Sequence, residues 1–302
     1  MSPKNLAASV HARLAEIARR TGRPFQELLQ YYAMERFLYR LSKSPHAARF
    51  VLKGALMLRV WDGPMARPTK DIDLLGRLEN SLENGSTVAR EVCALEVEPD
   101  GIVFRPATVK SERIREDADY EGVRIRFDGL LARARIAMQL DVGIGDVMVP
   151  GPVEIAYPTL LDFPAPRLKG YPRETAIAEK FEAMVKLGTL NSRMKDFYDI
   201  WLLSRQFAFD GPTLAQAVNA TFANRRTAVK ADPVALTAEF AESEVANTQW
   251  RAFVRKGRLG NAPAGLAEAV SGIARFLLPV ARAHLAGGNF KMNWTAGGPW
   301  RE

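Results

Sequence analysis

The chain has 302 residues, of which 47% are hydrophobic and 25% charged, the balance of an ordinary soluble globular protein. No apolar run approaches the ~20 residues that a membrane-spanning helix needs, and the first residues lack a secretory signal pattern. A lone cysteine, Cys93, excludes an internal disulfide and fits a reducing compartment. These features predict a cytoplasmic protein with no membrane association.

The net charge is +8 and the isoelectric point is about 9.7. A polyanionic partner, with nucleic acid foremost, explains such a balance, and so does a generally basic surface without a particular partner. Charge alone does not separate these two interpretations.

The first half of the chain predicts helices followed by strands. Apolar spacing indicates helices over residues 4–48, broken at Thr21–Pro24, and another helix over 46–60 that is interrupted at Lys53–Gly54. A strand is expected over 68–75 and a helix over 82–96.

Two alternating segments then predict a hairpin. Residues 123–127 and 136–142 alternate apolar and polar side chains, and Asp128–Gly129 between them is a turn signal. The Pro-rich stretch 150–172 resembles a linker. From Glu174 the pattern becomes helical. Helices are expected over 175–187, 193–204, 213–223, 233–243 and 263–285, followed by an irregular tail from Gly287 whose aromatic residues either dock or remain flexible. The pattern predicts an α+β protein.

The segment from Arg67 to Leu74 carries the most specific chemistry. Read as a strand with period two, Thr69, Asp71 and Asp73 share one face, opposite Ile72 and Leu74. Two neighbouring carboxylates repel each other, and Asp is disfavoured in strands, so a cation is expected between them. Mg²⁺ is typically held by one or two carboxylates plus substrate phosphates, which predicts a metal–nucleotide site here.

Asp141 lies on the polar face of the predicted hairpin and is a candidate third metal ligand, or else an ordinary strand-end acid. Three carboxylates on adjacent strands would suit two-metal phosphoryl chemistry. Lys53–Gly54 would allow close backbone approach to phosphate oxygens, although a single glycine is weak support.

Two predicted helices carry further candidates. Lys180 falls within the apolar stripe of helix 175–187, with Glu179, Glu182 and Lys186 on the opposite face. Lys180 either extends its ammonium to the rim of the protein or aims it into a cleft at an anion, and we favour the second reading.

Asp196 and Asp199 share one side of helix 193–204, which is apolar nearly all round. Asp196 is a candidate catalytic acid, a helix-start acid or a structural partner of Arg193, Lys195 or Lys180, and Asp199 is the weaker candidate.

The C-terminal part contains many basic residues, with Trp250 and Phe253 as candidate stacking platforms for nucleic acid. The three histidines fall outside every cluster, so neither a zinc site nor a Ser-His or Cys-His pair is predicted.

These motifs, taken in order, resemble a known family. They are Lys53-Gly54, Arg67-x-Thr69-x-Asp71-x-Asp73, Ala178-Glu179-Lys180 and Lys195-Asp196-x-x-Asp199. The set, over roughly residues 45–205, is similar to that of the AbiEii-type nucleotidyltransferase toxins, which include the MenT toxins of mycobacteria and belong to the DNA polymerase β-like superfamily.

The resemblance implies a nucleotidyltransferase core with a mixed β-sheet, preceded by N-terminal helices and followed by a helical C-terminal region. The expected domains are 1–165, holding the N-terminal helices and the core, and 166–302, a helical domain that contributes Lys and Asp to the active site. Many superfamily members have Gly-Ser or Gly-Gly where this chain has Gly54–Ala55, so a hydroxyl contact to phosphate is absent.

The resemblance also implies residue roles. Asp71, Asp73, Lys180 and Asp196 would be catalytic, with Asp71 and Asp73 binding Mg²⁺ or Mn²⁺. Asp141, assigned by its place in the hairpin pattern and not by a family motif, would be the third metal ligand. Lys53, Gly54, Arg67, Thr69 and Lys180 would bind the NTP. In some relatives a cognate antitoxin phosphorylates the residue that matches Thr69, and a phosphate there would repel both NTP and the carboxylates.

The resulting hypothesis is a Mg²⁺-dependent toxin of a toxin–antitoxin or phage-defence system that transfers NMP from an NTP to an RNA 3′ hydroxyl, with tRNA the expected acceptor. The same chemistry on a protein or small-molecule hydroxyl is one alternative. A non-catalytic module for nucleotide sensing or RNA binding is another.

Overall fold

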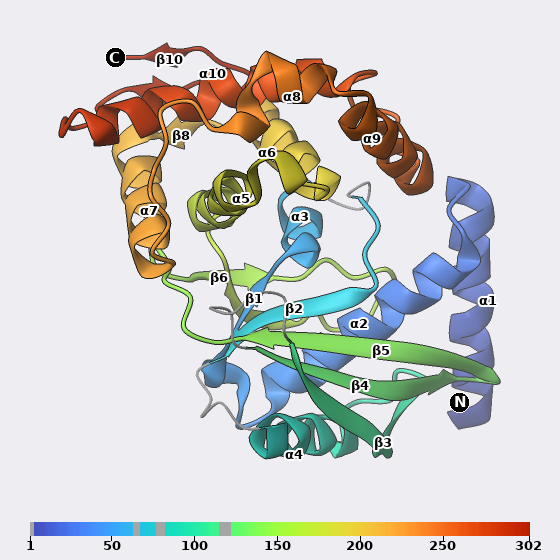
Figure 1. Ribbon diagram of the computed structural model, residues 1–302. Coiled ribbons are helices and arrows are strands. Elements are labelled where there is room, and N and C mark those ends of the chain that lie inside the picture. The colour runs from blue at the N-terminus through green and yellow to red at the C-terminus, as the bar shows by residue number, and fades with distance from the viewer. Residues whose placement is uncertain (1–2, 63–66, 77–81, 115–121) are drawn as a thin grey trace. The chain divides into compact units, whose positions relative to one another are not determined.

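The structure is a computed structural model that describes residues 3–62, 67–76, 82–114 and 122–302 (Figure 1). The chain forms two compact units. The first contains Met1–Gly145 and Val153–Gly170, and the second contains Asp146–Pro152 and Tyr171–Glu302.

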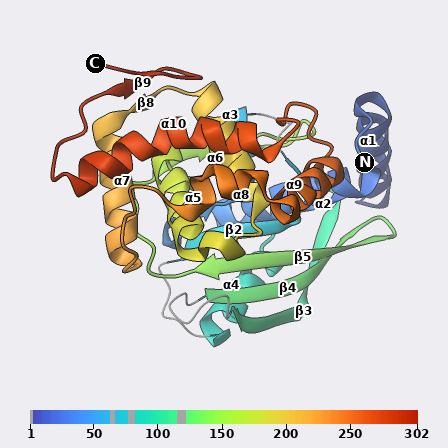
Figure 2. The ribbon, with the colours of Figure 1, turned by 45° about the horizontal axis from the view of Figure 1, so that its top comes forward.

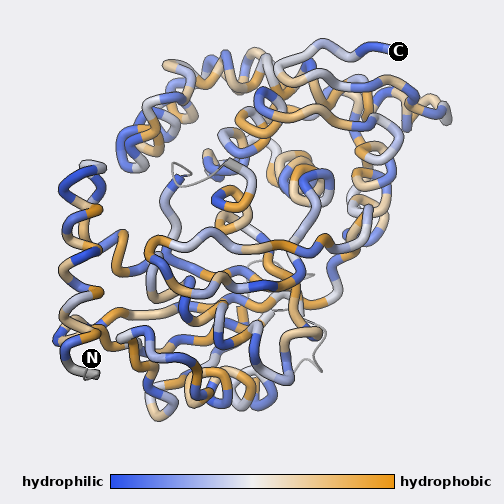
Figure 3. The backbone as a smooth tube through the Cα atoms, turned by 180° about the vertical axis from the view of Figure 1, so that it is seen from behind, coloured by the Kyte–Doolittle hydropathy of each residue, from blue (hydrophilic) through white to orange (hydrophobic). Residues whose placement is uncertain are grey.

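The first unit begins with the two predicted helices, α1 (Pro3–Thr21) and α2 (Phe25–Lys43), separated by the Gly22–Pro24 break. In α1 apolar and polar residues alternate along the helix at helical spacing (Figure 3). Val10 and Leu14 are fully buried. In α2 every residue from 28 to 41 is buried, including charged ones. The buried charges are paired, and Arg40 holds Asp100 through two hydrogen bonds of 2.7 and 3.1 Å.

A seven-stranded mixed sheet follows, in the order β3-β4-β5-β2-β1-β7-β6 (Figure 1). Its strands are β1 (Phe50–Lys53), β2 (Asp71–Gly76), β3 (Ile102–Ile114), β4 (Gly122–Leu131), β5 (Ala134–Gly143), β6 (Val153–Ala156) and β7 (Arg167–Gly170). Strand β2 pairs antiparallel with β1 and parallel with β5, so it lies near the middle of the sheet. Helix α2 packs against β5 and β7, while α4 (Leu82–Ala94) packs against β3 and β4.

Residues 46–60 do not form the expected interrupted helix. They form a short 3-10 helix, Ala47–Arg49, then strand β1 and helix α3 (Ala55–Asp62). A run of three apolar residues before Lys53 is too short to separate strand from helix by periodicity. The strand forms because β1 pairs with β2 on one side and with β7 on the other, a position in which all four of its residues are buried.

The predicted hairpin forms, but its turn was placed four residues too early. Asp128 and Gly129 lie within β4, opposite Ala137 and Ile136, and the chain reverses at Ala132–Arg133 instead. Ala132 adopts the positive φ of 51° that a tight turn requires.

Strands β3, β6 and β7 were not predicted from the sequence. Strand β3 was missed because Pro106 and a break in register between Arg105 and Lys110 interrupt its alternation. The stretch 150–172 is not a simple linker, since β7 pairs parallel with β1 inside the sheet and β6 pairs with β7.

The second unit is built from helices and a small sheet (Figure 2). Its helices are α5 (Arg173–Leu187), α6 (Met194–Gln206), α7 (Gly211–Asn224), α8 (Ala238–Glu242), α9 (Glu244–Gly257) and α10 (Leu266–Leu285), with short 3-10 turns at Gly188–Leu190 and Val234–Leu236. Helix α5 packs on α6 and α7, and α10 packs on α6 and α7.

The expected helix over 233–243 is instead a 3-10 turn followed by α8, and α9 was not predicted. The tail from Gly287 is mostly irregular, as expected, but it contains two strands of two residues each. Strand β8 (Phe209–Asp210) pairs with β9 (Asn293–Trp294), which pairs with β10 (Trp300–Arg301). The tail aromatics dock: Trp294 donates to the Ser204 carbonyl, and Trp300 stacks on Phe276 at 5.6 Å. Within the described residues, no helix has the length and apolar character needed to cross a membrane.

Candidate active site

Strand β2 presents two carboxylates on one face. Asp71 and Asp73 are both half-buried, while Ile72 and Leu74 on the other face are buried. The period of two therefore holds as the sequence predicts. Asp73 lies opposite Lys53 on β1 and opposite Asp141 on β5.

Gly54 lies directly against Asp73. Its φ is +68°, and a Cβ added there would lie only 2.0 Å from Asp73 Oδ2. A side chain at this position would both strain the backbone and displace the carboxylate. The Gly54 backbone thus lies close to the carboxylate of Asp73, while its approach to phosphate oxygens stays a prediction.

Asp141 has a firm partner of its own. Arg124 on β4 donates to both of its oxygens at 2.8 and 2.7 Å, and Gln139 donates to one of them at 3.2 Å. Among the residues that the structure describes, no three histidine, cysteine or carboxylate side chains gather closely enough to hold an ion on their own. Two carboxylates completed by substrate phosphates are nevertheless a common Mg²⁺ arrangement, and Asp71 with Asp73 fits it.

Tyr31 on α2 was not recognised from the sequence, and it holds the segment that precedes β2. Its hydroxyl donates to the Arg67 carbonyl at 3.3 Å and accepts from the Thr69 amide at 3.2 Å. Burial raises the pKa of Tyr31, so the hydroxyl stays protonated and able to donate. The Thr69 hydroxyl in turn accepts from the Asp71 amide at 3.4 Å. Arg67, Thr69 and Asp71 are thereby fixed relative to one another.

In the second unit, Lys180 of α5 joins both acids of α6. Its ammonium lies 2.9 Å from Asp196 and 2.8 Å from Asp199, two carboxylates that are each 1% exposed. Arg193 adds a second cation 2.7 Å from Asp196. Burial by itself would raise the pKa of Asp196, but Lys180, Arg193 and Lys195 together lower it below its ordinary value.

On the opposite face of α5, two glutamates are held by a cation. Glu182 is 2% exposed and accepts from Arg225 at 3.0 Å, and the same guanidinium bonds Asp146 at 3.0 Å. Glu179 lies 3.6 Å from Arg225 and accepts from Tyr171 at 3.0 Å. The two faces of α5 therefore each carry buried ion pairs, one centred on Lys180 and one on Arg225.

Trp250 is not available as a stacking platform for nucleic acid. Trp250 is 0% exposed, and its indole donates to the Pro263 carbonyl at 3.0 Å. It is a core residue that fixes a loop. Phe253, beside it, packs on Trp250 and Tyr198.

Two solved structures from Helicobacter pylori resemble the chain. One, described as a proposed nucleotidyltransferase, is 16% identical with a TM-score of 0.46, covering 85% of this chain and 93% of that one. The other, JHP933, is 13% identical with a TM-score of 0.50, covering 87% of this chain and 96% of that one. At such identities this likeness concerns the fold alone. No curated protein matches the sequence.

The family described as "Nucleotidyl transferase AbiEii toxin, Type IV TA system" matches residues 36–272, which span the sheet, both candidate clusters and most of the helical unit. The predicted nucleotidyltransferase and the α+β fold are thereby confirmed. The chain belongs to the AbiEii family of nucleotidyltransferase toxins.

Proposed function

We propose that the protein transfers NMP from an NTP to the 3′ hydroxyl of an RNA, with tRNA as the acceptor class, in a Mg²⁺-dependent reaction. The observation that carries the proposal is the pair Asp71 and Asp73 on one face of β2, with the Gly54 backbone pressed against the Asp73 carboxylate. A carboxylate pair completed by substrate phosphates is a common way to hold Mg²⁺, and the absence of a Cβ at Gly54 lets the Asp73 carboxylate keep its place on that face.

Asp71 and Asp73 would hold Mg²⁺ or Mn²⁺. Asp141 would join them if Arg124 gives up one of its two bonds to that carboxylate. The metal, when bound, activates the attacking hydroxyl and stabilises the charge on the leaving phosphates.

The remaining residues would bind and orient the nucleotide. Lys53, Gly54, Arg67 and Thr69 adjoin Asp71 and Asp73 along β1 and the start of β2. Lys180 would contact the phosphates. Asp196 and Asp199 would act through Lys180, since both carboxylates bind its ammonium.

An RNA acceptor agrees with the net charge of +8, which favours a polyanion over a small neutral molecule. Membership of a type IV toxin–antitoxin family supports a cognate antitoxin as partner. Thr69 is the proposed regulatory position. A phosphate on its hydroxyl would place a dianion beside the Asp71 amide to which that hydroxyl is bonded, and would repel both the carboxylates and NTP.

The test is incorporation of each of the four α-labelled NTPs into total tRNA with Mg²⁺. We expect one or more nucleotides to label tRNA in an RNase-sensitive form. Asp71→Asn should abolish the label while the protein keeps its melting temperature. Asp162→Asn, a fully exposed acid paired only at the surface, should leave the label unchanged.

Three results would contradict parts of this proposal. Label on protein or a small molecule, resistant to RNase, would keep the chemistry and reject the RNA acceptor. Tight NTP binding without any transfer would favour a nucleotide-sensing or RNA-binding module. Full transfer by Asp71→Asn would reject the metal assignment.

A further inference from the structure

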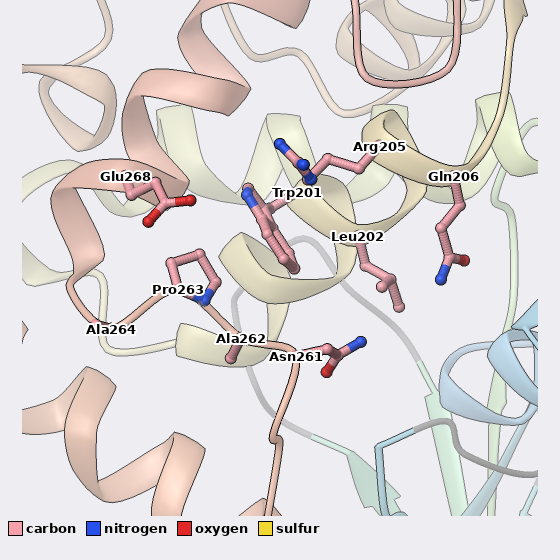
Figure 4. A pocket seen from close by; sticks show the side chains of 9 residues that line it. All are labelled: Trp201, Leu202, Arg205, Gln206, Asn261, Ala262, Pro263, Ala264 and Glu268. Carbon is pink, nitrogen blue, oxygen red and sulfur yellow. The ribbon is translucent and has the colours of Figure 1, made fainter.

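A cavity of about 500 Å³ lies wholly within the second unit, between the end of α6, the start of α10 and the loop that precedes α10 (Figure 4). Its size is that of a small-molecule or single-nucleotide site. None of the residues proposed for nucleotidyl transfer lines it.

One wall of the cavity carries an arginine that lies over an aromatic ring. The guanidinium of Arg205 lies over the indole of Trp201, 5.5 Å from the ring centroid. Trp201 is only 7% exposed, and Gly272 lets α10 approach it so closely that a Cβ there would lie 3.2 Å from the indole. The indole is thus a fixed support, and the exposed guanidinium plane above it is the surface that a ligand would meet.

Two hydrogen-bonding groups of opposite kind complete the lining. The Asn261 side-chain oxygen accepts from the Tyr198 hydroxyl at 2.9 Å, which leaves its NH₂ group as a donor. Glu268 offers a carboxylate that only accepts. Neither Arg205 nor Glu268 forms an ion pair with any part of the chain that the structure describes.

The wall that carries Asn261 is held in place. The buried indole of Trp250 donates to the Pro263 carbonyl at 3.0 Å, and Tyr198 holds Asn261 itself. Both anchors lie in the core of the unit, so the polar groups of the loop are fixed before any ligand arrives.

We propose that this cavity binds one unpaired nucleobase of an RNA, stacked on Arg205 and read at its edge by Asn261 and Glu268. Guanidinium planes backed by an aromatic ring are a usual platform for unstacked bases, and a base edge needs both a donor and an acceptor. A peptide side chain is the poorer fit, because the lining offers planar and polar surface rather than a closed apolar pocket. The inference rests on the proposed RNA acceptor.

The test measures binding, without NTP, of the Asp71→Asn protein to tRNA and to a short single-stranded RNA. Arg205→Ala should weaken binding of both by about tenfold, within the range reported for loss of one base stack. Arg205→Lys should weaken binding as much, because it keeps the charge and loses the plane. An oligonucleotide of the same length without bases should bind all three proteins equally.

Arg173→Ala is the matched control. Arg173 also lies over an aromatic ring, that of Phe207 at 4.2 Å, but outside the cavity, so its loss removes the same charge and a similar contact. We expect its RNA affinity to stay within about twofold of the parent, and the melting temperatures of the Arg205 and Arg173 variants to agree.

The proposal is overturned if Arg205→Ala has no effect, or if it weakens the oligonucleotide without bases equally, since that identifies a phosphate contact. Because no transfer is measured, base-dependent binding through Arg205 would stand even if tRNA were not labelled, and the acceptor proposal alone would then fall.

Discussion

Gly54 and Asp73 show how one missing side chain shapes the candidate site. Gly54→Ala would force a Cβ to within 2.0 Å of Asp73 Oδ2 and place alanine at a φ of +68°. We expect the free energy of unfolding to fall by about 1–3 kcal/mol and nucleotidyl transfer to fall by at least about a hundredfold. Denaturant titration and the tRNA-labelling assay measure the two effects.

Gly22 provides the matched control for that substitution. Its φ is +69°, and a Cβ there would meet nothing within 4 Å. Gly22→Ala should therefore carry the same backbone strain and keep full transfer activity. Equal loss of activity in both variants would show that strain, and not displacement of Asp73, is responsible.

At the level of single residues, much of the chemistry was readable from the sequence. Asp71 and Asp73 share a face because strand geometry alternates side chains, and Lys180 was recognised because lysine is unusual in an apolar stripe. Tyr31 was not recognised, because nothing in its neighbourhood of α2 distinguishes it from other buried aromatics. Its role comes from two backbone groups nearly forty positions away.

At the level of elements, α5 and α6 are joined by a buried ion cluster. Lys180→Met would leave Asp196 and Asp199 buried with one cation fewer, and we expect a loss of about 3 kcal/mol in unfolding free energy at pH 7. The native pKa of Asp196 is lowered, so its contribution to stability is fully present above the unfolded pKa of about 4 and is lost as pH falls below that value through the lower native pKa.

The difference in unfolding free energy between parent and Lys180→Met should therefore narrow as pH falls from about 4 through the lowered native pKa of Asp196, since protonation removes the buried negative charge that Lys180 compensates. Urea titrations across that range measure it. Lys180→Arg, which keeps the positive charge, should recover most of the stability. A difference that does not change with pH would mean that lost packing of the lysine stem, and not charge, dominates.

The hairpin shows why elements are easier to predict than their register. Both strands were recognised by alternation, but a turn at Asp128–Gly129 would have set Arg124 opposite Arg133. The observed register sets Arg124 opposite Asp141 and so forms the bidentate ion pair. Because the turn was predicted four residues too early, the pairing of Arg124 with the candidate metal ligand Asp141 could not be predicted.

At the level of the whole molecule, the chain does not divide at a single point. Segment Asp146–Pro152 belongs to the second unit, although it lies between parts of the first in sequence. Two contacts explain this: Asp146 pairs with Arg225, and the Val149 backbone exchanges hydrogen bonds with the Thr175 hydroxyl. Arg225 and Thr175 are both far from this segment in sequence, so the composition of the segment does not reveal that it belongs to the second unit.

The net charge of +8 leads to a prediction for the intact protein. If the acceptor is RNA, tRNA affinity should fall at least about tenfold between 50 and 200 mM salt, because phosphate contacts release counterions. Fluorescence anisotropy with labelled tRNA measures the slope. An affinity that does not depend on salt would contradict binding through the RNA phosphates and would favour a small-molecule acceptor.

The sequence by itself determined the residue types and their local spacing: the carboxylate pair of β2, the lysine of α5, the acids of α6 and the helical second half of the chain. These depend on periodicities of two and 3.6 residues, which short segments carry on their own. The tertiary structure decided the partners. It pairs Arg124 with Asp141 and Arg225 with Glu182, and it buries Trp250 against the Pro263 carbonyl. Each of these contacts joins residues from different elements of the chain. Such contacts depend on register and on packing between elements, and local patterns do not encode either.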